Sequence, residues 1–151
     1  MSSGLEDLYQ ELILDHSRHP HNFRAMEGAS RTIEGYNPLC GDELKLYLRL
    51  EGKRIADVSF QGKGCAISTA SASMLTDRLK GLSVREAEEL FEAVHELLTG
   101  GHSGPDPDAL GELEALAGVR KYPMRVKCAT LSWHALKAAL SDEQPESVTT
   151  E

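Results

Sequence analysis

Four leucines alternate with polar residues between positions 43 and 50, and this pattern constrains the fold more than any other part of the sequence. Successive side chains of a β-strand point to opposite faces, so the alternation predicts a strand that is buried on one face and solvated on the other. Turn residues follow at 51–54, and residues 55–60 then predict a second strand that returns antiparallel to the first. A sheet with one apolar face needs a layer of helices against it.

Apolar residues recur at helical spacing on both sides of this hairpin. They predict helices over residues 5–17, 66–80 and 83–99, from 106 to about 117, and after Cys128. A short strand is expected around residues 31–35. Most helices follow the strands, and we therefore expect an α+β fold, with a small antiparallel sheet of about three strands packed against several helices.

The length and charge of the chain limit its class. Its 151 residues suffice for one domain, which we expect to span residues 1–140, with residues 141–151 as a disordered polar tail. A formal charge of −8 disfavours nucleic acid and anionic membranes as main partners. No apolar stretch is long enough to span a membrane and no export signal is visible, so we expect a cytoplasmic protein with reduced thiols.

Three cysteines are the groups best suited to carry chemistry. Cys40 lies in a predicted loop and is followed by Gly41 and Asp42, while Cys65 and Cys128 each precede a predicted helix. Free backbone N–H groups at a helix start favour the thiolate form. Three thiolates and one carboxylate complete a tetrahedral site for a borderline-soft metal ion. A free cysteine is also often only a small apolar core residue, and that alternative stays open.

Positive charges accompany the cysteines. Lys63, Arg125 and Lys127 each lie within three residues of a cysteine. A zinc ion bound by three thiolates and a carboxylate would leave a net negative centre, which these cations could offset. Each of them, taken alone, is also compatible with an ordinary solvated surface charge.

Several histidines lie where the first predicted helix ends. A histidine at a helix C-terminus interacts favourably with the helix dipole when it is protonated. We interpret these residues in that way rather than as metal ligands. The histidines in question are His16, His19 and His21.

The motifs together resemble the IscU/SufU family of iron–sulfur cluster assembly proteins. The matching segments are the first helix with its closing proline, residues 37–42 around Cys40, residues 62–68 around Cys65, and residues 125–129 around Cys128. Within the family the chain looks more similar to SufU than to IscU. Residues 122–126 stand where IscU proteins carry Leu-Pro-Pro-Val-Lys, and a lysine replaces the histidine before the third cysteine.

This resemblance implies a SufE/IscU-like fold and a function in iron–sulfur cluster biogenesis. It implies that zinc is bound by four residues: Cys40, Asp42, Cys65 and Cys128. It further implies that Cys40 accepts persulfide sulfur from a SufS-like cysteine desulfurase and relays it to a downstream scaffold or to apo-proteins. Such a protein is a sulfurtransferase-like partner of the desulfurase rather than a stand-alone enzyme. Two alternatives stay open: the same ligands could hold iron or a [2Fe–2S] cluster that is assembled and handed on, or the zinc could be purely structural.

Overall fold

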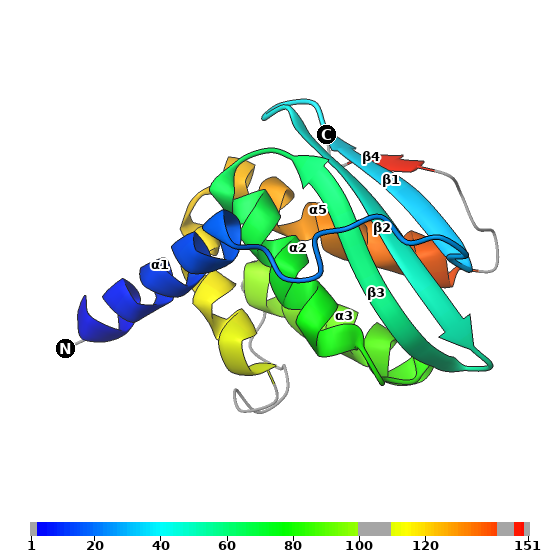
Figure 1. The fold of residues 1–151 in the computed structure, drawn as a ribbon. Coiled ribbons are helices and arrows are strands. Elements are labelled where there is room, and N and C mark those ends of the chain that lie inside the picture. Colours follow the sequence, from blue (N-terminus) through cyan, green and yellow to red (C-terminus); the bar gives the residue numbers. More distant parts are fainter. Residues whose placement is uncertain (1–2, 100–109, 142–146, 150–151) are drawn as a thin grey trace.

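The computed structural model describes residues 3–99, 110–141 and 147–149 (Figure 1). One sheet has the strand order β3-β2-β1-β4, formed by β1 (Arg31–Asn37), β2 (Asp42–Glu51), β3 (Arg54–Lys63) and β4 (Ser147–Thr149). The helices are α1 (Ser3–Arg18), α2 (Ala66–Leu79), α3 (Val84–Thr99), the 3₁₀ helix η1 (Gly111–Lys121) and α5 (Pro123–Leu140). The predicted α+β class is confirmed. No helix in these described ranges has the length and apolar character that a membrane span needs.

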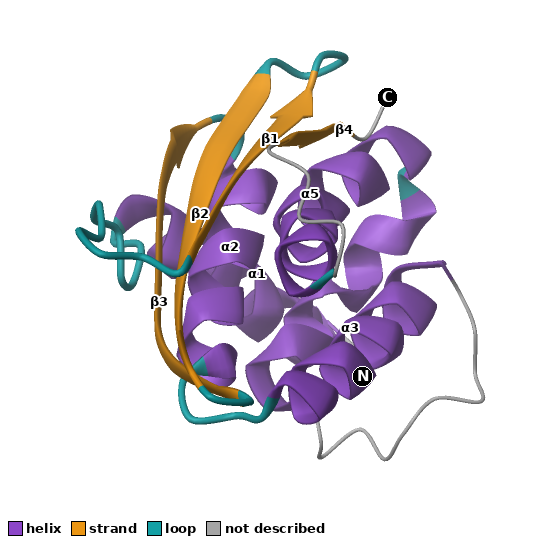
Figure 2. Cartoon of the chain, turned by 90° about the vertical axis from the view of Figure 1, so that its right-hand side faces the viewer, coloured by secondary structure: helices purple, strands orange, loops and turns teal. Residues whose placement is uncertain are grey.

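Strand β2 forms the centre of the sheet. The leucines at positions 44, 46 and 48 are buried, whereas the residues between them are half-buried or exposed, as the alternation predicts. β2 pairs antiparallel with both β1 and β3, and Leu46 stands opposite Ile33 on one side and Phe60 on the other. These three side chains belong to the buried core. Helices α2, α3 and α5 lie on one side of the sheet, against this apolar face (Figure 2).

The fourth strand corrects the expected strand count. Residues 147–149 lie in the stretch 141–151 that the sequence placed in a disordered tail, yet they form β4 and pair in parallel with residues 34–36 of β1. Val148 also packs, half-buried, against the core. An unpaired strand edge offers backbone donors and acceptors, which explains why even a polar segment adds to it. The expected disorder of residues 142–146 and 150–151 concerns positions outside the described residues.

Helices α2 and α5 pack together through small side chains. Nearly all residues from 68 to 76 of α2 are buried, and the small serine and alanine side chains of this segment allow a close approach to neighbouring elements. The Ser71 hydroxyl donates to the Ala129 carbonyl at 2.6 Å, and Trp133 Nε1 donates to Ser71 Oγ at 3.1 Å. These buried bonds fix the two helices side by side. As a result, the start of α2 lies near the first turns of α5.

Helix α5 also approaches β1 closely. A Cβ atom at Gly35 would lie 3.2 Å from Leu131 Cδ1, so the absence of a side chain makes room for the helix. Leu131 itself is fully buried. The expected helix from 106 to about 117 differs in the structure, where η1 covers residues 111–121 and residues 106–109 lie outside the described part.

Candidate metal centre

Three segments of the chain meet at one end of the sheet and bring candidate ligands together. Cys40 lies in the β1–β2 turn, Asp42 begins β2, Cys65 caps α2, and Cys128 lies in the second turn of α5. One ligand atom each from Cys40, Asp42 and Cys128 lies within 4.8 Å of the other two. The Cys65 sulfur is outside this group of three, but the Cys65 backbone N–H donates to Asp42 Oδ1 at 2.9 Å.

The turn that carries Cys40 is tight. The backbone N–H groups of Cys40 and Gly41 both donate to the Asn37 carbonyl, at 3.2 and 2.9 Å. Gly41 has a φ of +73°, a conformation that favours glycine. Cys40 is half-buried in this turn, whereas Cys128 is fully buried. The cluster therefore has one cysteine on its solvent side and one on its core side.

Asp42 is buried and is held by two hydrogen bonds. Oδ1 accepts from the Cys65 N–H, and Oδ2 accepts from Asn37 Nδ2 at 3.2 Å. Asn37 Nδ2 also lies 3.5 Å from Cys128 Sγ. The sequence analysis assigns no role to Asn37, although this residue begins the motif around Cys40 and is fully buried. Its position depends on strand register, because Asn37 stands directly opposite Asp42 in the β1–β2 pairing.

Cys65 lies at the helix start that the sequence predicts. It is the N-cap of α2, and its sulfur accepts a hydrogen bond from the Ser68 backbone N–H at 3.4 Å. A Cβ atom on the preceding Gly64 would lie 2.5 Å from Asp42 Oδ1. A glycine is thus required here for the start of α2 to approach the carboxylate.

Cys128 does not precede a helix, which corrects the sequence prediction. Helix α5 already begins at Pro123, because proline is well suited to the first turn of a helix. Burial raises the pKa of the Cys128 thiol, and its contacts with Asp42, Cys40 and Cys65 raise it further. A helix start therefore does not favour the thiolate form of Cys128, contrary to the sequence analysis. A metal ion that binds Cys128 would have to displace the proton of its thiol.

The three cations of the sequence analysis occupy different surroundings. The pKa of Arg125 is raised above its ordinary value, chiefly by its hydrogen bond with Cys128 and also by the charges of Cys65 and Cys40. Lys63 Nζ instead lies 3.7 Å from Glu43 Oε2, in an exposed pair. Lys127 is half-buried on α5 and forms no ion pair with a described residue. Of these three cations, Arg125 is the one whose raised pKa reports an interaction with the cysteines.

The donor set suits a borderline-soft divalent ion. Zinc bonds of about 2.0–2.3 Å place tetrahedral ligands roughly 3.3–3.8 Å apart. The ligand atoms of Cys40, Asp42 and Cys128, all within 4.8 Å of one another, need only small side-chain rotations to reach that spacing. The neighbouring Cys65 thiol could complete the set of four by turning away from the Ser68 N–H.

Residues 8–129, which include all three cysteine motifs, match the family model described as the NifU-like N terminal domain. The chain is 43% identical to the iron–sulfur cluster assembly scaffold protein IscU of Streptococcus pyogenes over 138 residues, which cover 91% of this chain and 86% of that protein. It is 38% identical to the zinc-dependent sulfurtransferase SufU of Bacillus subtilis over 143 residues, or 95% of this chain and 96% of that one.

A solved structure supports the same assignment. The crystal structure of FiSufU, a SUF-system protein from thermophilic Fervidobacterium islandicum AW-1, matches with a TM-score of 0.82 and 37% identity. The match covers 87% of this chain and 95% of FiSufU. The fold, the three cysteine motifs and these similarities agree, and the chain belongs to the NifU-like N-terminal domain family, which confirms its resemblance to IscU and SufU proteins.

Proposed function

We propose that the protein is a zinc-bound sulfur acceptor in iron–sulfur cluster biogenesis. The observation that carries this proposal is the arrangement of Cys40, which lies half-exposed in a turn while its neighbours Asp42 and Cys128 are buried. Cys40 can therefore meet a donor protein while Asp42 and Cys128 stay anchored in the core. Cys65 is also half-buried, but its sulfur is held at the start of α2 by the Ser68 N–H. The similarity to a protein named zinc-dependent sulfurtransferase supports this choice.

Four residues would hold the zinc ion: Cys40, Asp42, Cys65 and Cys128. Zinc, which has no redox chemistry of its own, would keep bound cysteines in the thiolate form. Asp42 supplies a hard oxygen donor among soft sulfur donors. The Asp42 side chain is already oriented by Asn37 and by the Cys65 N–H before any ion binds.

The sulfur donor would be a SufS-like cysteine desulfurase that carries a persulfide. The Cys40 thiolate attacks the terminal sulfur of this persulfide, so a new S–S bond forms at Cys40 while the S–S bond of the donor breaks. The desulfurase cysteine leaves as a thiolate, and no external oxidant or reductant is needed. The persulfide on Cys40 would then pass its sulfur to a downstream scaffold or to apo-proteins.

Mass spectrometry after incubation with a cysteine desulfurase and free cysteine tests this function. The peptide that contains Cys40 should gain about 32 mass units for each sulfur atom. A Cys40→Ala variant should gain none and should stay folded, because residue 40 lies in a half-exposed turn. Sulfur that maps to Cys65 or Cys128 instead would overturn the assignment.

A scaffold function is the second candidate, because the Streptococcus pyogenes relative is named a scaffold protein and cysteine thiolates also hold iron–sulfur clusters. Anaerobic incubation of the protein with iron(III) and sulfide separates the two. A coloured cluster that transfers to an apo-protein, without sulfur added to Cys40 by the desulfurase, would favour the scaffold.

A further inference from the structure

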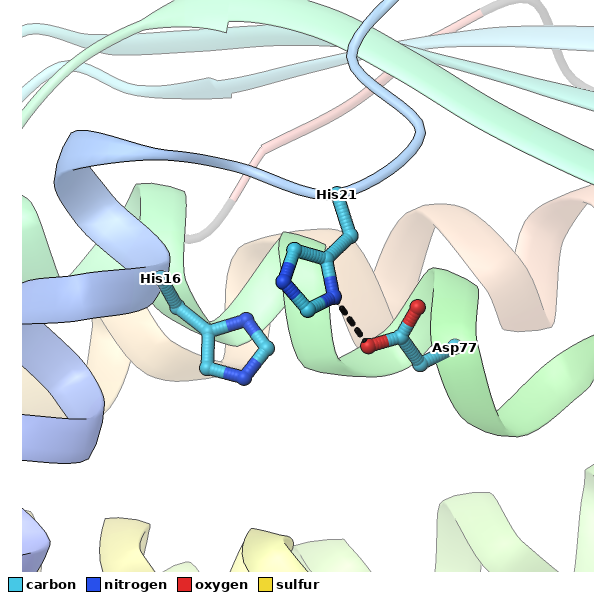
Figure 3. A group of neighbouring side chains, drawn as sticks. All are labelled: His16, His21 and Asp77. Atoms are coloured by element: carbon cyan, nitrogen blue, oxygen red, sulfur yellow. Dashed lines mark hydrogen bonds and ion pairs between the residues drawn. The ribbon is translucent and has the colours of Figure 1, made fainter.

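A second group of metal-ligating side chains lies outside the cysteine cluster. The imidazoles of His16 and His21 and the carboxylate of Asp77 converge between α1, the segment after it, and α2 (Figure 3). One ligand atom from each lies within 4.8 Å of the other two. The two rings are 4.5 Å apart at their centroids, and His21 Nδ1 lies 2.5 Å from Asp77 Oδ2. A role at the end of a helix dipole does not explain why these side chains converge.

Neighbouring residues orient these side chains. Ser73 Oγ lies 2.7 Å from His16 Nδ1 and accepts a hydrogen bond from the His21 backbone N–H at 2.8 Å. Asn22 Nδ2 donates to Asp77 Oδ1 at 3.3 Å. Metal-binding histidines and carboxylates are commonly fixed by outer contacts of this kind. The three side chains are therefore positioned in advance, and less conformational freedom is lost when an ion binds.

Glu112 indicates which nitrogen of His16 is available. Because Ser73 Oγ accepts from the His21 N–H, its own hydroxyl proton is free to point to His16 Nδ1. His16 Nε2 then carries the ring proton and donates to Glu112 Oε2 at 3.2 Å. A carboxylate that accepts from the remote N–H of a ligating histidine is a recurrent outer contact of metal sites. His16 Nδ1 thus keeps its lone pair, which accepts the hydroxyl proton of Ser73. A cation could bind this lone pair in place of that proton.

The cluster is open on one side. His16 is 1% exposed, but the side chains of His21 and Asp77 are 46% and 36% exposed. In the part of the chain that the structure describes, His21 Nε2 has no hydrogen-bond partner. An ion can therefore enter from solvent and retain water molecules in its remaining coordination positions.

We propose that His16, His21 and Asp77 bind a divalent first-row transition-metal ion. Two imidazole nitrogens and one carboxylate oxygen form a borderline ligand set, which suits zinc, cobalt(II), nickel(II) or iron(II) and leaves positions for water. This ligand set contains no sulfur, so it differs chemically from the cysteine cluster. The inference does not depend on sulfur transfer.

Cobalt(II) is the probe that tests this site. The full chain, first given one equivalent of zinc, is titrated with cobalt(II) and followed by calorimetry and by NMR of the histidine rings. One further equivalent should bind and shift the ring signals of His16 and His21. Cobalt on nitrogen and oxygen gives only weak visible bands, whereas cobalt on thiolates absorbs intensely, so the two sites are distinguishable.

Three exposed positions provide the variants. His21→Gln and Asp77→Asn should each lower the affinity for the second equivalent of metal, which is cobalt(II), at least about tenfold. His19→Gln is the matched control, because His19 is an exposed histidine outside the cluster. Thermal melts check that all three variants fold. The proposal is wrong if no second equivalent binds, if cobalt perturbs all histidines alike, or if His19→Gln weakens binding as much as His21→Gln.

Discussion

The backbone N–H of Cys65 donates a hydrogen bond to the carboxylate of Asp42, with a distance of 2.9 Å between nitrogen and Oδ1. This bond joins the start of β2 to the start of α2. The second oxygen of Asp42 accepts from Asn37 Nδ2, which lies at the end of β1. A single buried carboxylate therefore holds three segments of the candidate metal centre together, and Asp42 supports the fold even before a metal binds.

Replacement of Asp42 by alanine should destabilise the metal-free protein. The variant leaves the Cys65 N–H and the Asn37 amide without their acceptor, and a buried donor without a partner costs about 1–3 kcal/mol. Asp42→Asn is the matched control. Its Oδ1 can still accept from Cys65, and Asn37 Oδ1, which lacks a partner among the described residues, can accept from the new amide after a flip. Chemical denaturation compares the two variants, and equal stability of both would contradict the structural role of Asp42.

Replacement of Gly64 by alanine should weaken metal binding. The new Cβ atom would lie 2.5 Å from Asp42 Oδ1 and 3.2 Å from Asp42 Cα, so the carboxylate would have to move away from the cluster. Gly118→Ala is the control, because a Cβ atom there meets nothing within 4 Å and its φ is not in the left-handed region. Zinc competition against a chromophoric chelator measures the difference. A Gly64→Ala protein that holds zinc as tightly as Gly118→Ala would show that the position of this carboxylate is unimportant.

Two variants of Cys65 separate its role in folding from its role in metal binding. Serine is a preferred N-cap residue, so Cys65→Ser should keep the hydrogen bond from the Ser68 N–H and the stability of the metal-free protein. Cys65→Ala should lose about 0.5–2 kcal/mol, because the cap is gone. If Cys65 binds the metal, both variants should lose the stabilisation that zinc adds. Thermal melts with and without chelator measure both quantities, and a Cys65→Ser protein with the full zinc effect would exclude this cysteine as a ligand.

The sequence predicted those elements whose own residue pattern shows which of their faces is buried. The alternation around Leu46 predicted β2, and the small residues after Cys65 predicted the start of α2. β4 escaped prediction because its three residues carry too little apolar character, and its pairing depends on the edge of β1. The start of α5 was placed too late because the apolar spacing becomes clear only after Cys128, whereas Pro123 already begins the helix.

The candidate site was only partly predictable for a related reason. The residue types at Cys40, Asp42 and Cys128 indicated metal chemistry, but their convergence results from the β1–β2 turn and from the packing of α5. The contribution of Asn37 depends on register, since a shift of one residue would turn its side chain to the other face of the sheet. Long-range packing of this kind leaves no periodic signal in the sequence.

Arg125 and Lys63 differ in their surroundings, and this difference yields a further prediction. Both are cations close to a cysteine in sequence. Arg125 interacts with Cys128 and also electrostatically with Cys40, whereas Lys63 forms an ion pair with Glu43. A positive charge near a thiol favours the thiolate, which is the reactive form. Arg125→Gln should therefore slow the alkylation of Cys40 in metal-free protein at pH 7 by roughly twofold to tenfold.

Lys63→Gln is the matched control and should leave this alkylation rate unchanged. The effect of Arg125 should also shrink in about 1 M salt, because Arg125 is exposed and its charge is screened there. Stopped-flow reaction with a chromogenic disulfide, followed by mapping of the modified cysteine, measures the rate at Cys40 alone. Equal slowing in both variants would mean that overall charge controls the reaction. No slowing in Arg125→Gln would mean that its guanidinium acts on the buried Cys128 and does not reach the solvent-facing cysteine.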